Sequence, residues 1–247
     1  MAFGRCRVRR DPYHWRESPS MYVDARAPWP STEAEALAEQ DRIRRLVQTT
    51  GTLGRVRLVA GLDVAYANDS AQLAAAVVVL DAESLLPVEQ RLFRGEATFP
   101  YVPGLLAFRE LPGLVEALRK VEAAPDVLVC DGHGIAHPRR AGLACHVGVL
   151  TGLPTIGVAK SRFIGTYDEP AAHRGAWADL IDEGEVIGRA LRTRPGTRPV
   201  YVSVGHLVTL DVACELTMKL TPAHRLPEPI RAADHAARTA LIGNVTT

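Results

Sequence analysis

Three strand-like segments follow one another with very short connections, and this arrangement limits the fold more than any other feature of the chain. The segments RVRLVAGLDVAYA (55–67), QLAAAVVVLDA (72–82) and PVEQRLFRGEA (87–97) are rich in apolar and β-compatible residues. The turn-like sequences NDS and AESLLP separate them. Because a parallel pair of strands needs a crossover of a dozen or more residues, connections this short predict an antiparallel three-stranded meander.

A strand, a helix and a second strand follow in the middle of the chain. DVLVC (126–130) and PTIGVA (154–159) flank RRAGLACHVGVLTG (139–152), a helix-like segment that ends at a glycine. Such a unit places its two strands parallel in one sheet. Residues 198–206 predict a further strand. The chain is therefore predicted to form an α/β domain, with a mixed sheet of three antiparallel strands followed by parallel strands, flanked by helices.

Further helices are predicted around these strands. A helix over 31–48 begins at the N-cap candidate Ser31, and 105–124 has helical period, although Pro112 must kink it or begin a second segment. Two more helices are predicted at 209–220 and 226–243. The first thirty residues show no clear periodicity. We therefore interpret 1–30 as an N-terminal extension of unknown role and 31–247 as a single domain.

Composition excludes several classes of protein. The 247 residues are 47% hydrophobic and 23% charged, which is typical of an ordinary globular protein. No apolar run approaches the roughly 20 residues that span a bilayer, and no apolar stretch follows the basic N-terminus as in a signal peptide. We therefore expect a cytoplasmic monomer with no membrane partner. The four cysteines form no CxxC pair, which argues against a zinc knuckle. With a net charge of +1, binding to nucleic acid would need locally clustered basic groups.

Three carboxylates lie at significant places in the predicted order. Asp63 lies within an apolar strand, Glu110 lies on the helix after the meander, and Asp131 lies at the carboxyl end of the fourth strand. Open α/β sheets place their sites at such strand ends, and a charge inside an apolar strand is costly unless it is paired or bound to metal. Each acid alone also fits an ordinary strand end or helix surface. Their joint placement favours one reaction centre.

A shared acidic centre implies a cation. Neighbouring carboxylates repel one another unless a cation neutralises them, and oxygen-only ligands select Mg²⁺ or Mn²⁺ over zinc. Two such ions, roughly 3.5–4 Å apart, activate a water and stabilise the leaving oxygen in phosphodiester hydrolysis. The acids therefore predict Mg²⁺-dependent phosphodiester chemistry, with Mn²⁺ as a substitute.

Four longer segments carry a family resemblance. AGLDVAY, FPYVPGLLAFRE, DGHGIAHPRRAGLACHVGVLTGLPTIGVAKSR and LPEPIRAADHAAR together resemble endonuclease V, the deoxyinosine 3′ endonuclease family. The resemblance implies a ribonuclease H-like fold, which agrees with the elements predicted above. It also implies recognition of hypoxanthine, the product of adenine deamination. Such an enzyme hydrolyses the second phosphodiester bond 3′ to the lesion with Mg²⁺ or Mn²⁺, and leaves 3′-hydroxyl and 5′-phosphate ends.

The matched motifs imply roles for individual charged residues. By resemblance, Asp63, Glu110 and Asp131 are the catalytic acids and metal ligands. Asp234 occupies a position where the family carries Asp or His near the metal, although an exposed helix acid is an equal alternative. Lys160 ends the strand TIGVAK and would stabilise charge at the scissile phosphate; a solvated strand-end lysine is the alternative.

Two histidines lie in the segment DGHGIAHPRR. His137 resembles the family's active-site histidine, which implies contact with phosphate or orientation of the nucleophilic water. His133 is a second candidate in the same loop. A zinc pair of these two is disfavoured, because Gly134 and the loop context oppose the helical i,i+4 geometry that such a pair needs.

The sequence PYVP (100–103) resembles the family's wedge. A tyrosine between two prolines lies on a stiff loop, so Tyr101 is expected to enter the base stack where a nucleotide is turned out. An extruded base costs a few kcal/mol and is then read in a pocket by its edges. Gly104 and Gly132 would let backbone groups approach that base closely. The alternative for Tyr101 is an amphipathic side chain that covers the core at a turn.

Three arginines near the predicted centre would supply local positive charge to the DNA backbone. They are Arg139, Arg140 and Arg162, and a charged helix face is the alternative for the first two. One position departs from the family pattern. An arginine commonly follows the histidine in GHLV (205–208), so Leu207 is expected to remove a phosphate contact.

The predicted function is repair of DNA that contains deoxyinosine, by a metal-dependent endonuclease. One alternative is a nuclease that acts mainly on inosine-containing RNA or on a branched DNA junction. Another is a non-catalytic binder of deaminated nucleic acid, which would keep Tyr101 and the basic groups without needing all the acids. An acyl hydrolase is disfavoured, because the chain has no GxSxG elbow to activate a serine.

Overall fold

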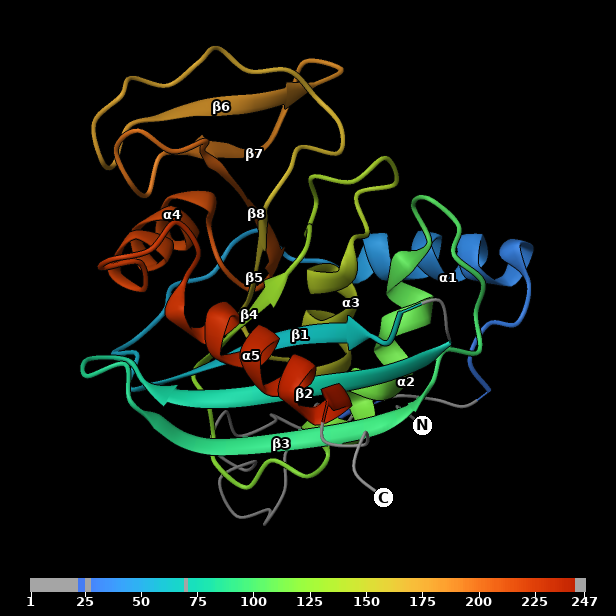
Figure 1. Cartoon of the computed structure of the whole chain (residues 1–247). Helices are drawn as coiled ribbons and strands as arrows, with labels where there is room; N and C mark the ends of the chain where they lie inside the picture. The colour runs from blue at the N-terminus through green and yellow to red at the C-terminus, as the bar shows by residue number, and fades with distance from the viewer. Residues whose placement is uncertain (1–21, 25–27, 69–70, 243–247) are drawn as a thin grey trace, which may run out of the picture.

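Eight strands form one mixed sheet in the computed structural model, which describes residues 22–24, 28–68 and 71–242 (Figure 1). The order across the sheet is β3-β2-β1-β4-β5-β8-β7-β6. The strands are β1 (Leu58–Tyr66), β2 (Gln72–Asp81), β3 (Pro87–Glu96), β4 (Val127–Asp131), β5 (Thr155–Ala159), β6 (Trp177–Asp182), β7 (Glu185–Leu191) and β8 (Val200–His206). The predicted N-terminal extension, residues 1–30, lies largely outside the described residues.

The meander and the strand–helix–strand unit are both present, so the predicted fold class is confirmed. β2 pairs antiparallel with both β1 and β3, whereas β4 pairs parallel with both β1 and β5. Helix α3 (Leu143–Thr151) connects β4 to β5, and Gly152 ends it in the left-handed conformation at φ 66°. Glycine adopts that conformation without steric cost, which explains the sharp stop. This is the ribonuclease H-like arrangement that the resemblance implied.

Two features of the sheet differ from the sequence prediction. The β6–β7 hairpin extends the sheet in a segment where no strand was predicted; its turn contains Glu183 and Gly184, both at positive φ. Two successive left-handed residues match the twist of a tight hairpin. The strand β8 runs antiparallel to β5, so the parallel region contains only β1, β4 and β5.

Helix α2 (Leu106–Leu118) is continuous through Pro112, so the second helical segment considered above does not form. The helix packs closely on the sheet, where a Cβ at Gly113 would lie 3.0 Å from Leu73 and 3.3 Å from Ala75. Burial against β2 therefore offsets the backbone hydrogen bond that proline removes.

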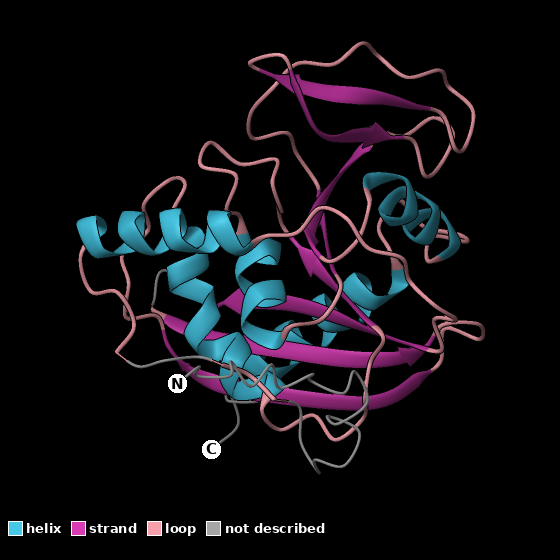
Figure 2. Cartoon of the chain, turned by 180° about the vertical axis from the view of Figure 1, so that it is seen from behind, coloured by secondary structure: helices cyan, strands magenta, loops and turns pink. Residues whose placement is uncertain are grey.

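Helices cover both faces of the sheet (Figure 1, Figure 2). The helices α2 and α3 pack on one face, and α4 (Leu210–Lys219) and α5 (Glu228–Ile242) pack on the other. Helix α1 (Glu33–Leu46) begins with a capping box of Thr32 and Glu35 and contacts α3. Small side chains on α5 let it lie close to the sheet; a Cβ at Gly61 would be only 2.0 Å from the Pro229 carbonyl oxygen. Among the described residues, no helix combines the length and apolar character needed to cross a membrane.

Candidate active site

The carboxyl ends of the three parallel strands bring Asp63, Asp131 and Lys160 together. Leu62 of β1 pairs with Cys130 of β4, so Asp63 and Asp131 occupy the next positions on adjacent strands. Lys160 directly follows β5, the other neighbour of β4. The structure therefore places the two predicted strand acids and the predicted lysine at one edge of the sheet, as expected for parallel strand ends.

Helices on opposite faces add the other two predicted acids. Side chains alternate between faces along a strand, and Gly61 faces α5, so Asp63 also lies on the α5 side. From α5, the Asp234 carboxylate lies close enough to that of Asp63 for each to affect the pKa of the other. Glu110 lies on α2, which packs on the opposite face of the sheet from α5. Its pKa responds to the negative charges of both Asp63 and Asp131, which places all four acids in one electrostatic cluster.

One cavity of about 480 Å³ is lined by most of the predicted site residues. Those lining it are Asp63, Tyr101, Gly104, Glu110, Asp131, Gly132, His133, His137, Lys160, Arg162 and Asp234. Arg139 and Arg140 do not line it. The wedge candidate and the acidic centre therefore open into the same space, although they are distant in sequence.

Burial and mutual repulsion hold protons on two of the acids. Burial, followed by the charge of Asp131, raises the pKa of Asp63 to about 8. Burial, followed by the charges of Asp63 and Asp131, raises the pKa of Glu110 to about 8. At these two carboxylates, burial and the neighbouring negative charges outweigh the positive charge nearby.

Two cations of the chain neutralise the other acids. Lys160 Nζ forms an ion pair with Asp131 Oδ2, and Arg238 Nε bonds to Asp234 Oδ1 at 2.8 Å. Among the described residues, no group of three or more Asp, Glu, His or Cys side chains is arranged to hold a metal ion as it stands. The chemistry of the donor set nevertheless fits Mg²⁺ or Mn²⁺, because all four groups are carboxylates and their repulsion is what a divalent cation relieves.

The stability of the metal-free protein should depend on pH through Asp63 and Glu110. Their ordinary pKa values are 3.8 and 4.5, so the folded chain binds protons that the unfolded chain releases. This contribution to stability is full below about pH 4 and is lost as pH rises through about 8. In EDTA, the free energy of unfolding is expected to fall by roughly 1–2 kcal/mol between pH 7 and 8.

Urea unfolding at several pH values measures this dependence. The Asp63→Asn variant should reduce the slope by at least half, because it removes one titrating group and also lowers the repulsion on Glu110. A stability that stays flat from pH 7 to 8 in the unsubstituted protein would contradict the raised pKa values.

His137 bonds to the backbone of the loop that contains Tyr101. Its Nδ1 accepts from the Arg139 backbone N–H at 3.2 Å, which leaves Nε2 as the donor to the Gly104 carbonyl at 3.0 Å. Burial lowers the pKa of His137 to about 4, so the ring is neutral at pH 7. The structure thus gives His137 a partner on the loop, whereas a contact with phosphate stays a prediction.

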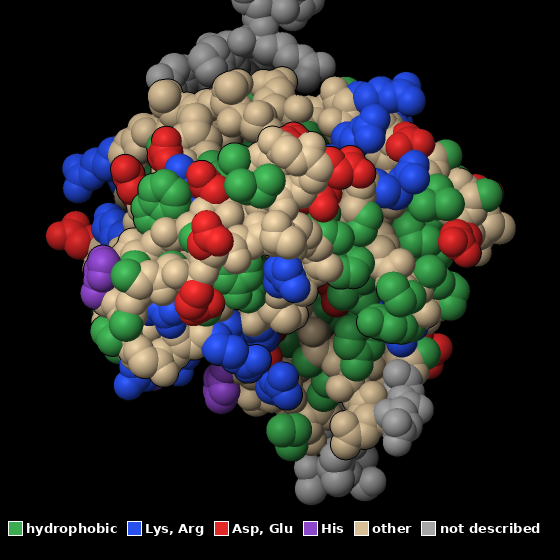
Figure 3. All heavy atoms as spheres, turned by 90° about the horizontal axis from the view of Figure 1, so that it is seen from above, with side chains coloured by type: hydrophobic (Ala, Val, Ile, Leu, Met, Phe, Trp, Pro, Cys, Tyr) green, Lys and Arg blue, Asp and Glu red, His purple; other side chains and the backbone are tan. Residues whose placement is uncertain are grey.

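The two arginines of the AHPRR segment pair with acids outside the cavity. Arg139 Nη2 lies 2.6 Å from Asp41 of α1, and Arg140 bonds to Asp182 at 2.9 Å and to Glu185 at 2.8 Å on the β6–β7 hairpin. Basic side chains on the face that contains this hairpin form separate groups (Figure 3). The ion pairs tie the segment to α1 and to the hairpin, and a DNA contact by either arginine stays a prediction.

Arg162 and Leu207 lie at opposite ends of the sheet. Arg162 is exposed and lines the cavity, close behind Lys160. Leu207 follows His206, which pairs with Thr155 at the start of β5. Lys160 lies beyond the other end of that strand, and Leu207 does not line the cavity. The loss of a phosphate contact at Leu207 stays a prediction.

Phe163 lines the cavity and was missed by the sequence analysis. Its side chain is 42% exposed, and its ring centroid lies 5.5 Å from that of His137 and 6.0 Å from that of His133. Tyr101, at 70% exposed, is the other exposed aromatic of the cavity. Aromatic faces stack on nucleic-acid bases. The available signal was an aromatic three positions after Lys160, just beyond the matched segment.

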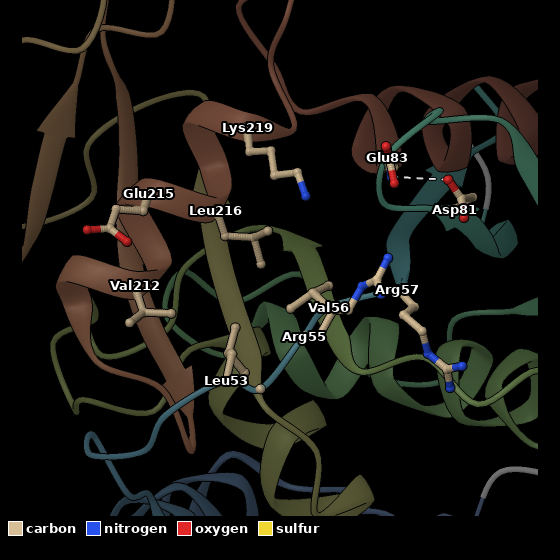
Figure 4. Close-up of a pocket in the computed structure, with 11 residues that line it drawn as sticks. Leu53, Arg55, Val56, Arg57, Asp81, Glu83, Val212, Glu215, Leu216 and Lys219 are labelled. Carbon is tan, nitrogen blue, oxygen red and sulfur yellow. Dashed lines mark hydrogen bonds between the residues drawn. The ribbon is translucent and has the colours of Figure 1, made fainter.

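A second cavity of about 550 Å³ lies between α4 and the segment before β1 (Figure 4). None of the predicted site residues lines it. Its charged side chains are Arg55, Arg57, Lys219, Asp81, Glu83 and Glu215. Because three basic and three acidic groups balance there, its charge favours neither an anion nor a cation.

Comparison with known proteins agrees with this geometry. The family model described as Endonuclease V matches residues 40–235. An endonuclease V from Roseiflexus sp. (strain RS-1) is 53% identical over 210 residues, which cover 85% of this chain and 94% of the relative. The family-model match, residues 40–235, includes every predicted acid of the cavity.

Solved structures give the same result. The crystal structure of endonuclease V from Streptomyces avermitilis superposes with a TM-score of 0.84 at 50% identity, covering 91% of this chain and 100% of that one. The Ciona intestinalis endonuclease V, solved in complex with a 24mer DNA containing an inosine followed by a ribo-adenosine, has a TM-score of 0.75 at 30% identity and covers 85% and 98% of the two chains. The chain therefore belongs to the endonuclease V family of nucleases.

Proposed function

We propose that the protein is a metal-dependent endonuclease that recognises deoxyinosine in DNA and hydrolyses the second phosphodiester bond 3′ to the lesion. The observation that carries this proposal is the single cavity shared by the acidic cluster and the exposed Tyr101. The Ciona intestinalis relative, solved with inosine-containing DNA, supports the choice of substrate. Repair of deaminated adenine is the role that such a reaction would serve.

The acids Asp63, Glu110, Asp131 and Asp234 would hold Mg²⁺, with Mn²⁺ as a substitute. When bound, the cation supplies neutralising charge and Lewis-acid polarisation at the phosphate. The raised pKa values of Asp63 and Glu110 support this assignment, because a site that is short of positive charge favours a cation.

The cations of the chain act at the phosphate. Lys160 already faces Asp131 in the cavity, so its ammonium group can stabilise charge on a phosphoryl oxygen. Arg162, exposed at the same cavity, would neutralise a neighbouring backbone phosphate. His137 remains neutral and holds the Gly104 carbonyl.

Tyr101 and Phe163 would support the extruded nucleotide and the disturbed base stack. Replacing Tyr101 with alanine should weaken cleavage of an inosine-containing oligonucleotide roughly 10- to 100-fold, because stacking on one base contributes about 1–3 kcal/mol. The side chain is 70% exposed, so stability should not change. Steady-state cleavage measures the effect. Tyr22→Ala is the matched control, since Tyr22 is 69% exposed and does not line the cavity; equal losses in both variants would contradict a wedge role.

The direct test is incubation with Mg²⁺ and an inosine-containing oligonucleotide, with an active family member alongside. The expected product is a nick one nucleotide beyond the inosine. Matched DNA, RNA and branched-junction substrates separate deoxyinosine repair from the same-fold alternatives. If the relative cuts and this protein binds the oligonucleotide without cutting it, the proposal fails and the non-catalytic binder replaces it.

A further inference from the structure

We propose that Gln40 of α1 is a positioning residue for the loop that contains Tyr101, a role that rests on the proposed function. Gln40 is 0% exposed and lies on the same helix face as the buried Ala36 and Ile43. Burying an amide in such surroundings costs free energy unless its polar atoms are bonded. The presence of a glutamine at this position therefore needs a partner that explains it.

The partner is the backbone of the loop. Gln40 Nε2 donates to the Gly104 carbonyl oxygen at 2.7 Å, across 64 positions of sequence. Within the described part of the chain, the Oε1 atom of Gln40 has no hydrogen-bond partner. Turning the amide over would place Oε1 against the carbonyl oxygen, so the donor must face Gly104. The buried, unbonded Oε1 atom lowers the stability of the fold, whereas the bond from Nε2 to Gly104 is the favourable contribution of this side chain.

Two donors from distant elements hold the same carbonyl. His137 Nε2 bonds to Gly104 O at 3.0 Å, so both lone pairs of that oxygen are used. Gly104 has φ 85°, in the left-handed region that favours glycine, and the Leu105 N–H bonds to Val102 O at 2.9 Å in the same turn. The turn that directs the loop is thus fixed at one atom by α1 and by the His137 loop.

The helix that carries Gln40 is itself fixed to the site. The neighbouring Asp41 pairs with Arg139 at 2.6 Å, two positions after His137. At the far end of α1, the Gln48 N–H bonds to His206 Nδ1 at 3.1 Å. Gln40 and His137 therefore belong to segments that are bonded to each other. Their two hydrogen bonds fix the Gly104 carbonyl relative to both segments.

The side chain of Tyr101 is 70% exposed, so its own packing adds little to the restraint of the loop. Without the Gln40 donor, the Gly104 carbonyl retains only the His137 bond, and more of the ordering of the turn must occur when substrate binds. The acids of the cavity are untouched. The expected effect is a rise of roughly three- to tenfold in KM for an inosine-containing oligonucleotide with little change in kcat, the size expected for one hydrogen bond.

The test compares Gln40→Met with Ile43→Met. The first keeps the length of the side chain without the donor, and the second alters a buried residue on the same helix face that makes no bond to Gly104. Hydrogen exchange of the free protein should show the Leu105 amide exchanging at least about tenfold faster in Gln40→Met than in Ile43→Met. Cleavage kinetics should show the KM effect only in Gln40→Met. If Gln40→Met does not fold, Gln40→Asn, whose amide falls one methylene short, carries the same expectation.

Each result decides a separate point. Equal exchange at Leu105 in the two variants overturns the proposal, because Gln40 then does not hold the loop. Faster exchange with unchanged KM and kcat overturns the positioning role in the reaction. A wild-type protein that cuts no inosine-containing DNA refutes the proposed function, and exchange at Leu105 still shows whether Gln40 fixes the turn.

Discussion

Replacing Asp131 with alanine is expected to lower the rate of cleavage of an inosine-containing oligonucleotide by about a thousandfold or more while leaving binding largely intact. Charge stabilisation by a bound metal contributes several kcal/mol to the transition state, and each 1.36 kcal/mol is tenfold in rate. Asp131 ends β4, which lies between β1, the strand that carries Asp63, and β5, the strand that Lys160 follows. Asp63→Ala should have an effect of similar size.

Neither change should unfold the protein. Alanine at Asp131 removes a carboxylate whose pKa burial raises, and the Lys160 ammonium it leaves behind is half-exposed. Single-turnover cleavage with Mg²⁺ and fluorescence anisotropy in EDTA measure the two properties separately. Asp211→Ala is the control, because it breaks an exposed ion pair with Arg189 outside the cavity. Unchanged cleavage in Asp131→Ala would refute its metal role, and loss of binding would show that its role is not confined to the chemical step.

The elements predicted from sequence are those with strong local signals. The short apolar runs of β1, β2, β4 and β5 favour strands, and short connections determine which strands pair antiparallel. The β6–β7 hairpin lies at the edge of the sheet, where Trp177, Ile181 and Val186 are exposed while Leu180 and Ile187 are buried. Its hydrophobic pattern is therefore weak. The strand β8 follows that hairpin in the chain, and its local sequence contains no information about its direction relative to β5.

The residues of the candidate site also differ in how far the sequence alone could predict them. Asp63 and Asp131 were predictable because the ends of parallel strands meet at one edge of a sheet. Glu110 and Asp234 reach the cavity only through the docking of α2 and α5. The position of Glu110 on the helix after the meander indicated it, whereas only the family resemblance indicated Asp234. The partner of Gln40 is 64 positions away, a separation that no local pattern can reveal.

The mutation with the largest expected effect on stability is Gly61→Ala, on the strand that positions Asp63. A Cβ at Gly61 would lie 2.0 Å from the carbonyl oxygen of Pro229 and 2.2 Å from its carbonyl carbon. Both are backbone atoms, so either β1 or α5 must move. Overpacking costs about 1–3 kcal/mol where side chains can adjust; here they cannot, and we expect a loss of about 3 kcal/mol or more in the free energy of unfolding.

The same displacement should also lower activity in the fraction that stays folded. Helix α5 carries Asp234, so a shift of the helix moves that carboxylate away from Asp63. Gly54→Ala is the matched control, because a Cβ there meets nothing within 4 Å and its φ is not in the left-handed region; it should change stability by less than about 0.5 kcal/mol. Urea unfolding and the cleavage rate per folded molecule measure both effects. If Gly61→Ala is as stable as Gly54→Ala, close packing of α5 on β1 is not what holds Asp234 at the centre.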